Sequence, residues 1–186
     1  MNISALKIDG LVLRPVEQLD AARFAILCND KLLAENTARI PHPYSIEDAR
    51  DFVKRAKTEF TSGKEFRFAV CRDDVVVACC GVIPKDDQSC ELGYWVGAED
   101  RGKGVASRAA SAVVEFAFQH CGAAKITAGH FTDNPASRRV LEKLGFRPTG
   151  ETIQTMSLAR GADVETARFS LSRRWFAPLA PVQIAR

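Results

Sequence analysis

Apolar and polar residues alternate over residues 10–16, GLVLRPV, and this two-residue period predicts a first strand. Three further runs have the composition of strands: FRFAVCR, VVVACCGVI and CELGYWVG. Turn-forming residues separate them, first Asp73-Asp74 and then the segment 84–87. Because short turns join antiparallel neighbours, we expect these three runs to form an antiparallel meander. A short strand at KITAG and a closing hairpin around Arg160-Gly161 complete the predicted strands.

Helical signals separate these strands. A helical stretch from Glu17 to about Leu27 follows the first strand, and the segment IPHPY then excludes regular structure. Ser45, which acidic residues follow, signals the start of a second helix, and Gly63 signals its end. The apolar residues of this helix recur at helical spacing: Ile46, Ala49, Phe52, Val53 and Ala56.

Two more helices are expected in the second half of the chain. Residues 104–119 form the third, and Gly122 stops it. One face of this helix is apolar: Val105, Ala109, Ala112, Val113 and Phe116. Asn134 is the cap of the fourth helix, Pro135 its favoured first residue and Gly145 its terminator. The pattern as a whole predicts a mixed α/β sheet with helices on its faces.

Length and composition fit one globular domain over residues 1–186. The chain is 46% apolar and 26% charged, and its net charge of +3 gives no argument for a nucleic-acid partner. The first ten residues lack a basic segment followed by an apolar core, and no apolar run approaches the length of a membrane span. We therefore expect a cytoplasmic protein that neither crosses a membrane nor binds nucleic acid.

The six cysteines do not indicate a metal site. No C-x-x-C pair occurs, and several cysteines stand inside apolar stretches such as VVVACCGVI. The three histidines show no spacing with them that would make a zinc site. We expect most of the cysteines to be reduced core residues and no metal to be bound.

The hexapeptide RGKGVA, residues 101–106, joins a predicted strand to a predicted helix. A glycine-rich turn at that place exposes backbone N–H groups beside the positive end of the helix dipole, which makes a site for an anion such as phosphate. No Walker sequence is present, and the third glycine of the dinucleotide fingerprint is missing. A solvated turn whose glycines only permit positive φ is the alternative.

The chain resembles the GNAT superfamily of acetyltransferases in three blocks that occur in the family's order. RGKGVA matches the acyl-CoA pyrophosphate motif R/Q-x-x-G-x-G/A, with Arg101, Gly104 and Ala106 on the motif positions. ELGYWVG before it and DNPASRRVLEKLGFRPTG after it resemble the subgroup that acetylates N-terminal amines of ribosomal proteins. The resemblance covers Leu11 to Trp175. The same pattern also serves enzymes that act on polyamines, antibiotics and other small amines.

The resemblance implies the GNAT fold, a mostly antiparallel twisted sheet with helices on both faces, in which the fourth strand parts from the fifth. It implies that the pantetheine arm of acetyl-CoA lies in that gap, along the backbone of Trp95, Val96 and Gly97. It assigns the pyrophosphate to the loop and the following turn of helix: Arg101, Gly102, Lys103, Gly104, Val105, Ala106 and Ser107. Asn134 matches the family asparagine near the pantetheine.

Two residues are the candidates for the chemistry. In the resembling enzymes a glutamate at the position of Glu91 is proposed as the base and the serine at Ser137 as the acid that protonates the thiolate. Ser137 shares a helical face with apolar residues and should point inward. Tyr94 is an alternative acid, although strand alternation places it on the face opposite Glu91 and core packing also explains it. His130 is a secondary candidate.

The function that these assignments imply is acetyl-CoA-dependent N-acetyl transfer to a primary amine by direct attack. The α-amine of a ribosomal or other protein is one acceptor, and an amine of pKa near 7.8 is roughly a tenth neutral at pH 7. Small amines and a non-catalytic acyl-CoA sensor are the alternatives. We expect residues 29–44, which include His42, and the closing hairpin to build the acceptor pocket. Trp175 and Phe176 are expected to pack on the body or to form a homodimer contact.

Overall fold

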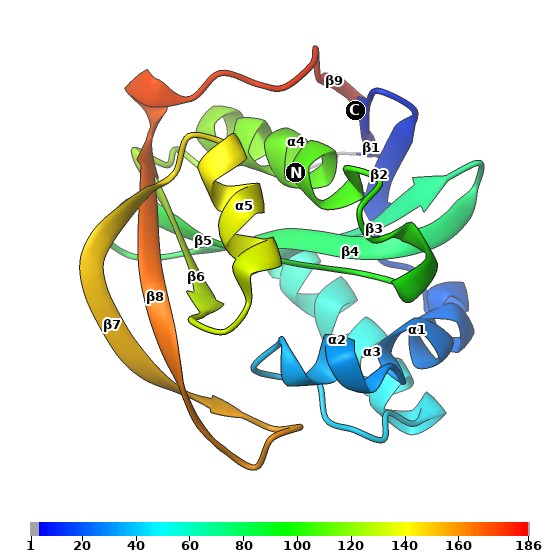
Figure 1. Ribbon diagram of the computed structural model, residues 1–186. Coiled ribbons are helices and arrows are strands. Elements are labelled where there is room, and N and C mark those ends of the chain that lie inside the picture. The colour runs from blue at the N-terminus through cyan, green and yellow to red at the C-terminus, as the bar shows by residue number, and fades with distance from the viewer. Residues whose placement is uncertain (1–3, 186) are drawn as a thin grey trace.

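The computed structural model describes residues 4–185 and contains one nine-stranded sheet in the order β7-β8-β6-β5-β4-β3-β2-β1-β9 (Figure 1). Neighbouring strands are antiparallel except for the parallel pair β5 and β6. The strands are β1 (Ala5–Ile8), β2 (Leu11–Pro15), β3 (Phe66–Arg72), β4 (Val75–Pro84), β5 (Ser89–Val96), β6 (Lys125–Phe131), β7 (Arg147–Ser157), β8 (Ala162–Ser172) and β9 (Gln183–Ala185). Residues 1–3 and 186 of the predicted domain lie outside the described residues, so its ends stay a prediction.

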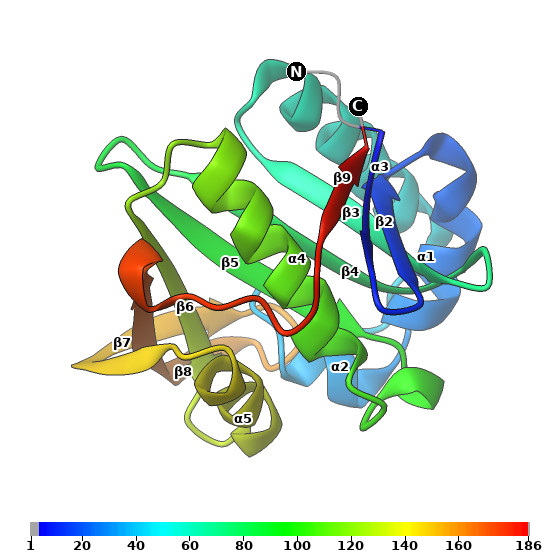
Figure 2. The same ribbon diagram turned by 90° about the horizontal axis from the view of Figure 1, so that it is seen from above.

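Helices cover both faces of this sheet. Helices α4 (Val105–His120) and α5 (Pro135–Lys143) lie on one face, and α1 (Ala21–Cys28), α2 (Lys31–Glu35) and α3 (Ile46–Ser62) lie on the other (Figures 1 and 2). Three short 3₁₀ turns complete the elements: Gln18–Asp20, Ala98–Asp100 and Arg173–Trp175. The predicted mixed sheet with helices on its faces is confirmed.

The local signals placed the longer elements correctly. The meander β3-β4-β5 is antiparallel, and the hairpin β7-β8 turns at the predicted place. Ser45 and Asp48 form the capping box of α3, and Gly63 ends it with φ of 74°. Asn134 caps α5, whose first residue is Pro135.

Three short elements were not predicted from the sequence, namely β1, β9 and α2. β1 pairs with β2 across a turn at Asp9 and Gly10 and with β9 from the other end of the chain. α2 occupies five residues between the first predicted helix and IPHPY, where no element was predicted. Elements of three to five residues carry too little periodicity to be recognised, because pairing and packing with distant segments stabilise them.

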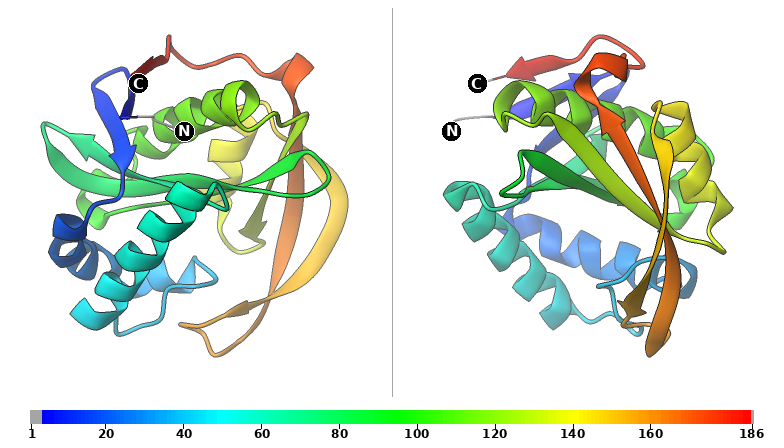
Figure 3. Two further views of the ribbon diagram at one scale, coloured as in Figure 1. Left: turned by 180° about the vertical axis from the view of Figure 1, so that it is seen from behind. Right: turned by 90° about the vertical axis from the view of Figure 1, so that its left-hand side faces the viewer.

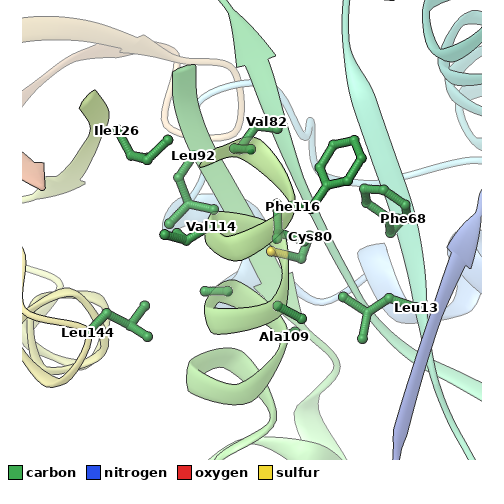
Figure 4. Packing of buried hydrophobic residues seen from close by; sticks show 14 of the residues in the cluster. Leu13, Phe68, Cys80, Val82, Leu92, Ala109, Val114, Phe116, Ile126 and Leu144 are labelled. Carbon is green, nitrogen blue, oxygen red and sulfur yellow. The ribbon is translucent and has the colours of Figure 1, made fainter. Parts of the chain in front are cut away.

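Helix α4 is the centre of the larger core. Phe116 is fully buried and lies near Phe68 in the core (Figure 4). Its ring meets those of Phe66 and Phe68 edge-on, with centroid distances of 5.2 and 5.3 Å. The chain between β8 and β9 crosses the outer side of α4, where Leu179 N donates to Ser111 Oγ over 3.0 Å (Figures 2 and 3). Both sides of α4 are therefore covered, which explains why its apolar face is so wide.

A second core holds α1 and α3 against the opposite face of the sheet, with Phe24 at its centre. Phe24 contacts Phe52 of α3 and Trp95 of β5 edge-on, with centroid distances of 5.5 and 5.4 Å. This core fixes α3 at the place where one wall of the site described below is formed.

Strands β5 and β6 part soon after they meet. They pair only where Ser89–Glu91 lie beside Lys125–Thr127, and β5 then continues to Val96 without a partner on that side. This parting is the one that the resemblance implied for the fourth and fifth predicted strands. It leaves backbone groups of β5 unpaired in the middle of the sheet, and two cavities meet there.

Candidate active site

Two cavities open along the gap between β5 and β6. The first, which we call the groove, has a volume of about 460 Å³ and lies between the 100–107 loop, α5 and α2. The second, which we call the chamber, has a volume of about 620 Å³ and lies between α3, residues 36–44 and the β7-β8 hairpin. The residues that line both cavities are Asn36, Thr37, Tyr94, Trp95, Asn134 and Ser137. The groove and the chamber therefore meet at Tyr94 and Ser137.

The RGKGVA loop forms one end of the groove. Gly102 and Gly104 each have φ of +75°, a conformation that side chains with a Cβ adopt at a cost, and a Cβ built on either would meet no atom within 4 Å. Gly104 is the N-cap of α4, and no side chain caps this helix. The N–H groups of the first turn of α4 are therefore open to an anion in the groove.

Of the two cations of the loop, Arg101 lines the groove and Lys103 does not. Arg101 Nη2 donates to Asp30 Oδ2 over 2.6 Å, and Arg101 Nε donates to the carbonyl of Val96 over 3.2 Å. Lys103 is exposed and does not line the groove, and its Nζ lies 3.9 Å from Asp100 Oδ1. Arg101 thus joins α2 to the end of β5.

Most of the other predicted cofactor residues line the groove: Trp95, Val96, Gly102, Gly104, Val105, Ala106, Ser107 and Asn134. Gly97 does not. Its N–H donates to the carbonyl of Val77 over 2.9 Å, and an added Cβ would lie 2.6 Å from Leu27 Cδ2. Close packing of the chain against α1 therefore explains the glycine at this position.

Sequence reasoning missed two cations of the groove, Arg139 and Lys143 on α5. They share a helical face with Ala136 and Val140, which also line the groove. The i, i+4 spacing of two basic residues was the available signal, but a surface helix shows such pairs without any ligand. Only the packing of α5 beside the loop shows which face of this helix meets the groove.

Ser137 and Tyr94 form a direct contact. Their hydroxyl oxygens lie 2.9 Å apart, and the Tyr94 hydroxyl also donates to the Ser137 carbonyl over 3.2 Å. Asn134 Oδ1 accepts a hydrogen bond from Ser137 N over 3.1 Å, which fixes this turn of helix. Burial raises the pKa of Tyr94, so its hydroxyl keeps its proton at neutral pH. The two candidate acids are thus one hydrogen-bonded pair.

Glu91 lines the chamber as a paired carboxylate. Arg168 Nη1 donates to its Oε1 over 3.0 Å, and Lys85 Nζ lies 3.2 Å from its Oε2. Burial alone would raise the pKa of Glu91, but these two cations outweigh burial and hold the pKa below the usual 4.5. Glu91 is therefore an ionised but weak base, three residues before Tyr94 on the same strand.

The ion pairs of Glu91 lead to a pH-dependent contribution to stability. Because its pKa is lowered on folding, this contribution is present above pH 4.5 and disappears as the pH falls through the pKa of Glu91 in the folded protein. We expect Glu91→Gln to lower the free energy of unfolding by about 1 kcal/mol at pH 7. The difference from wild type should shrink below pH 4.5, and urea unfolding between pH 3 and 7 measures it. A difference that does not change with pH would show that the carboxylate charge is not the cause.

The chamber contains a second group of paired charges beneath α3. Glu65 is buried and forms an ion pair with Arg67. A hydrogen bond with Glu65, together with burial, raises the pKa of Glu59. The buried Glu65 is thus paired with arginine, and the neighbouring Glu59 takes up a proton more readily than an ordinary glutamate.

Arg160 at the tip of the β7-β8 hairpin holds the walls of the chamber together. Its Nη1 and Nη2 donate to the two carboxylate oxygens of Asp133 over 2.6 and 3.2 Å, and its Nε donates to the carbonyl of Glu35 over 2.7 Å. Leu158 N donates to the carbonyl of Ala38 over 3.0 Å. The hairpin thus contacts the segment after α2 and the residue before Asn134, and both predicted segments, 29–44 and the hairpin, line the chamber.

The two histidines named from the sequence differ in their positions. His130 is buried and lines the chamber, with its Nδ1 2.7 Å from the carbonyl of Phe131, whereas His42 is exposed and does not line it.

Within residues 4–185, no group of three or more His, Cys, Asp and Glu side chains could hold a metal ion. No helix in that range is long and apolar enough to cross a membrane. Phe176 packs on Phe118, while Trp175 is 56% exposed.

Comparisons with known proteins agree with this geometry. Residues 10–147 match the family described as the acetyltransferase (GNAT) domain. The chain is 30% identical over 171 residues to the uncharacterized N-acetyltransferase YoaA of Bacillus subtilis (strain 168), a match that covers 89% of this chain and 95% of YoaA.

Two solved structures have the same fold. The ribosomal L7/L12 α-N-protein acetyltransferase RimL, in complex with coenzyme A, superposes with a TM-score of 0.82 at 15% identity over 91% of this chain and 98% of its own. The spermidine N-acetyltransferase of Vibrio cholerae, in complex with CoA and spermine, superposes with a TM-score of 0.75 at 19% identity over 89% and 97%. The family match covers the parted strands, the glycine loop and the serine helix, and the chain belongs to the GNAT family of N-acetyltransferases.

Proposed function

We propose that the protein transfers the acetyl group of acetyl-CoA to the α-amine of a peptide or protein N-terminus by direct attack. The observation that carries the proposal is the meeting of the groove and the chamber at Tyr94 and Ser137. A cofactor arm in the groove and an amine in the chamber would approach each other only there. One cavity alone would serve a binding protein, whereas two that meet at a pair of proton donors suit a transfer reaction.

The residues of the groove fit acetyl-CoA. The two glycines with positive φ leave an open space beside the N-terminus of α4, which suits a pyrophosphate. The unpaired edge of β5 from Leu92 to Val96 offers backbone groups to a pantetheine amide. RimL and the spermidine N-acetyltransferase, which share the fold, were solved with CoA. When bound, acetyl-CoA supplies the activated acetyl group.

The protein side chains then have to move protons. In this proposal Ser137 Oγ would supply the proton for the leaving thiolate, and the Tyr94 hydroxyl, 2.9 Å away, would return one to the serine. The amine loses its proton after attack, and Glu91 accepts it through water in the chamber, since strand alternation keeps its carboxylate on the other face of β5 from Tyr94.

A weak base favours an acceptor with a low pKa. Arg168 and Lys85 hold Glu91 ionised, with a pKa below 4.5, so it is too weak a base to deprotonate a strongly basic ammonium ion before attack. The acceptor therefore has to arrive as the neutral amine. An α-amine of pKa near 7.8 is roughly a tenth neutral at pH 7, whereas an alkylamine near 10.4 is only about one part in two thousand neutral. This difference supports an N-terminal α-amine over a polyamine or a lysine side chain.

The chamber gives no support to an acyl-enzyme. Among the cysteines, all of which lie in the described part of the chain, Cys28 is the one that lines a cavity. Burial raises the pKa of its thiol, so that it stays protonated and is a poor nucleophile at neutral pH. Direct attack by the amine is therefore the favoured route.

Two measurements test the proposed function. First, acetyl-CoA at about a hundred times its Kd should raise the free energy of unfolding by roughly 2.7 kcal/mol, whereas ATP should not. Second, thiol release from acetyl-CoA should be faster with a peptide that begins with a free Ser or Ala than with spermidine, at equal concentration and pH 7. Faster release with spermidine would overturn the α-amine assignment. Stabilisation without release by any amine would favour a sensor.

A further inference from the structure

We infer that Arg139 and Lys143 of α5 bind the 3′-phosphate of coenzyme A, so that the protein distinguishes CoA from 3′-dephospho-CoA. The inference rests on the proposed function, because it assumes that CoA occupies the groove. It deepens that proposal by naming the residues that bind the 3′-phosphate, a group for which the glycine loop provides no partner.

The first step is an account of the cations around the groove. Arg101 lines the groove, but Asp30 and the carbonyl of Val96 already accept its hydrogen bonds, and Lys103 does not line the cavity. Arg139 and Lys143 do line it, and neither forms an ion pair within residues 4–185. Among the described residues, these two side chains are therefore the groove cations without a carboxylate partner, and they are available to a polyanion.

The second step is the position of these cations along the groove. Ser137 lies where the groove meets the chamber, and Lys143 follows it by six residues, about 9 Å further along the helix axis at 1.5 Å per residue. The acetyl end of the cofactor belongs at Ser137 in the proposed function. Arg139 and especially Lys143 therefore lie toward the nucleotide end.

The third step is the chemistry of the three phosphates. The pyrophosphate is matched by the backbone N–H groups at the start of α4, which the glycines leave open. The 3′-phosphate is a monoester on the ribose and carries close to two negative charges at neutral pH, as phosphate monoesters do. A pair of exposed cations one helical turn apart suits such a dianion, since arginine binds phosphate through two hydrogen bonds and lysine adds a point charge.

The same helix provides a matched control. Arg138 is adjacent in sequence but does not line the groove, and its Nε donates to Glu142 Oε1 over 2.7 Å. Arg138→Ala removes one positive charge from the same helix, from a face that does not meet the groove. This variant therefore distinguishes the effect of losing a contact in the groove from the effect of losing positive charge on the helix.

The experiment is calorimetric titration of the wild-type protein, the double variant Arg139→Ala/Lys143→Ala and Arg138→Ala with CoA and with 3′-dephospho-CoA, without any amine. We expect wild type to prefer CoA by about tenfold, which corresponds to about 1.4 kcal/mol. The double variant should lose most of this preference while its affinity for 3′-dephospho-CoA changes by less than about twofold. Arg138→Ala should keep the preference. The preference of wild type should also weaken when the salt concentration is raised.

Each other result has a definite meaning. Equal affinity of wild type for the two ligands, or an equal loss for both ligands in the double variant, would overturn the 3′-phosphate assignment and leave the proposed function intact. Failure of wild type to bind either ligand would overturn the proposed function together with the inference. Both substituted side chains are exposed, so the variants should fold, and their thermal unfolding without ligand checks this.

Discussion

Replacement of Ser137 by alanine lowers kcat by about 10²–10³-fold, as expected for loss of a positioned general acid, while the affinity for acetyl-CoA changes little. The fold should survive, since the Tyr94 hydroxyl keeps a hydrogen bond to the Ser137 carbonyl and the cap from Asn134 uses the backbone N–H. The measurement is steady-state thiol release with the best amine, beside titration of acetyl-CoA.

Two companion variants locate the proton donor. Ser137→Thr keeps a hydroxyl and should restore part of the rate. Tyr94→Phe removes the partner at 2.9 Å and should lower kcat less than Ser137→Ala does, by about tenfold, if the tyrosine only returns a proton to the serine. If Tyr94→Phe is the more damaging of the two, the tyrosine is the acid and Ser137 positions it. Unchanged turnover in Ser137→Ala would remove the serine from the mechanism.

Replacement of Gly104 by valine should abolish the stabilisation of roughly 2.7 kcal/mol that acetyl-CoA at a hundred times its Kd gives to the wild type. The substitution has two effects. It introduces a β-branched residue at φ of +75°, which costs about 1–2 kcal/mol, and it places a side chain at the N-cap of α4, where the groove needs open backbone. Thermal unfolding without acetyl-CoA measures the loss of intrinsic stability, and unfolding with acetyl-CoA measures the loss of the stabilisation by the ligand.

Gly122 supplies the matched control. It follows the other end of α4, has φ of +63°, would place a Cβ in open space, and does not line either cavity. Gly122→Val should lose a similar amount of intrinsic stability but keep the full response to acetyl-CoA. If both variants keep the response, the loop glycines only form a turn, and the pyrophosphate is not bound there.

The helix boundaries show what the sequence determines through local contacts. The capping box of Ser45 and Asp48 and the cap of Asn134 on Ser137 are each made between residues three apart. The left-handed conformations of Gly63 and Gly104 are likewise properties of single residues. Signals of this kind act within one turn of the chain, so α3, α5 and the loop before α4 could be placed without knowledge of the rest.

The arrangement of the site could be predicted only in outline. The sequence indicated Glu91 and Ser137 as candidates, and treated Tyr94 as an alternative that core packing also explained. The hydrogen bond that joins Tyr94 to Ser137 spans 43 residues, and the ion pair that holds Arg101 spans 71. The sequence around one residue gives no signal of its contact partner, because these contacts form only when the sheet brings β5 beside α5 and α2.

The sequence by itself determined the mixed sheet, its longer helices and the glycine loop, because periodicity, caps and turns act over a few neighbouring residues. The tertiary structure alone decided that Arg101 is held by Asp30, that Arg139 and Lys143 face the groove, and that Tyr94 contacts Ser137. These features depend on how distant segments pack. Packing is a property of the whole set of buried surfaces, and no short stretch of the chain encodes it.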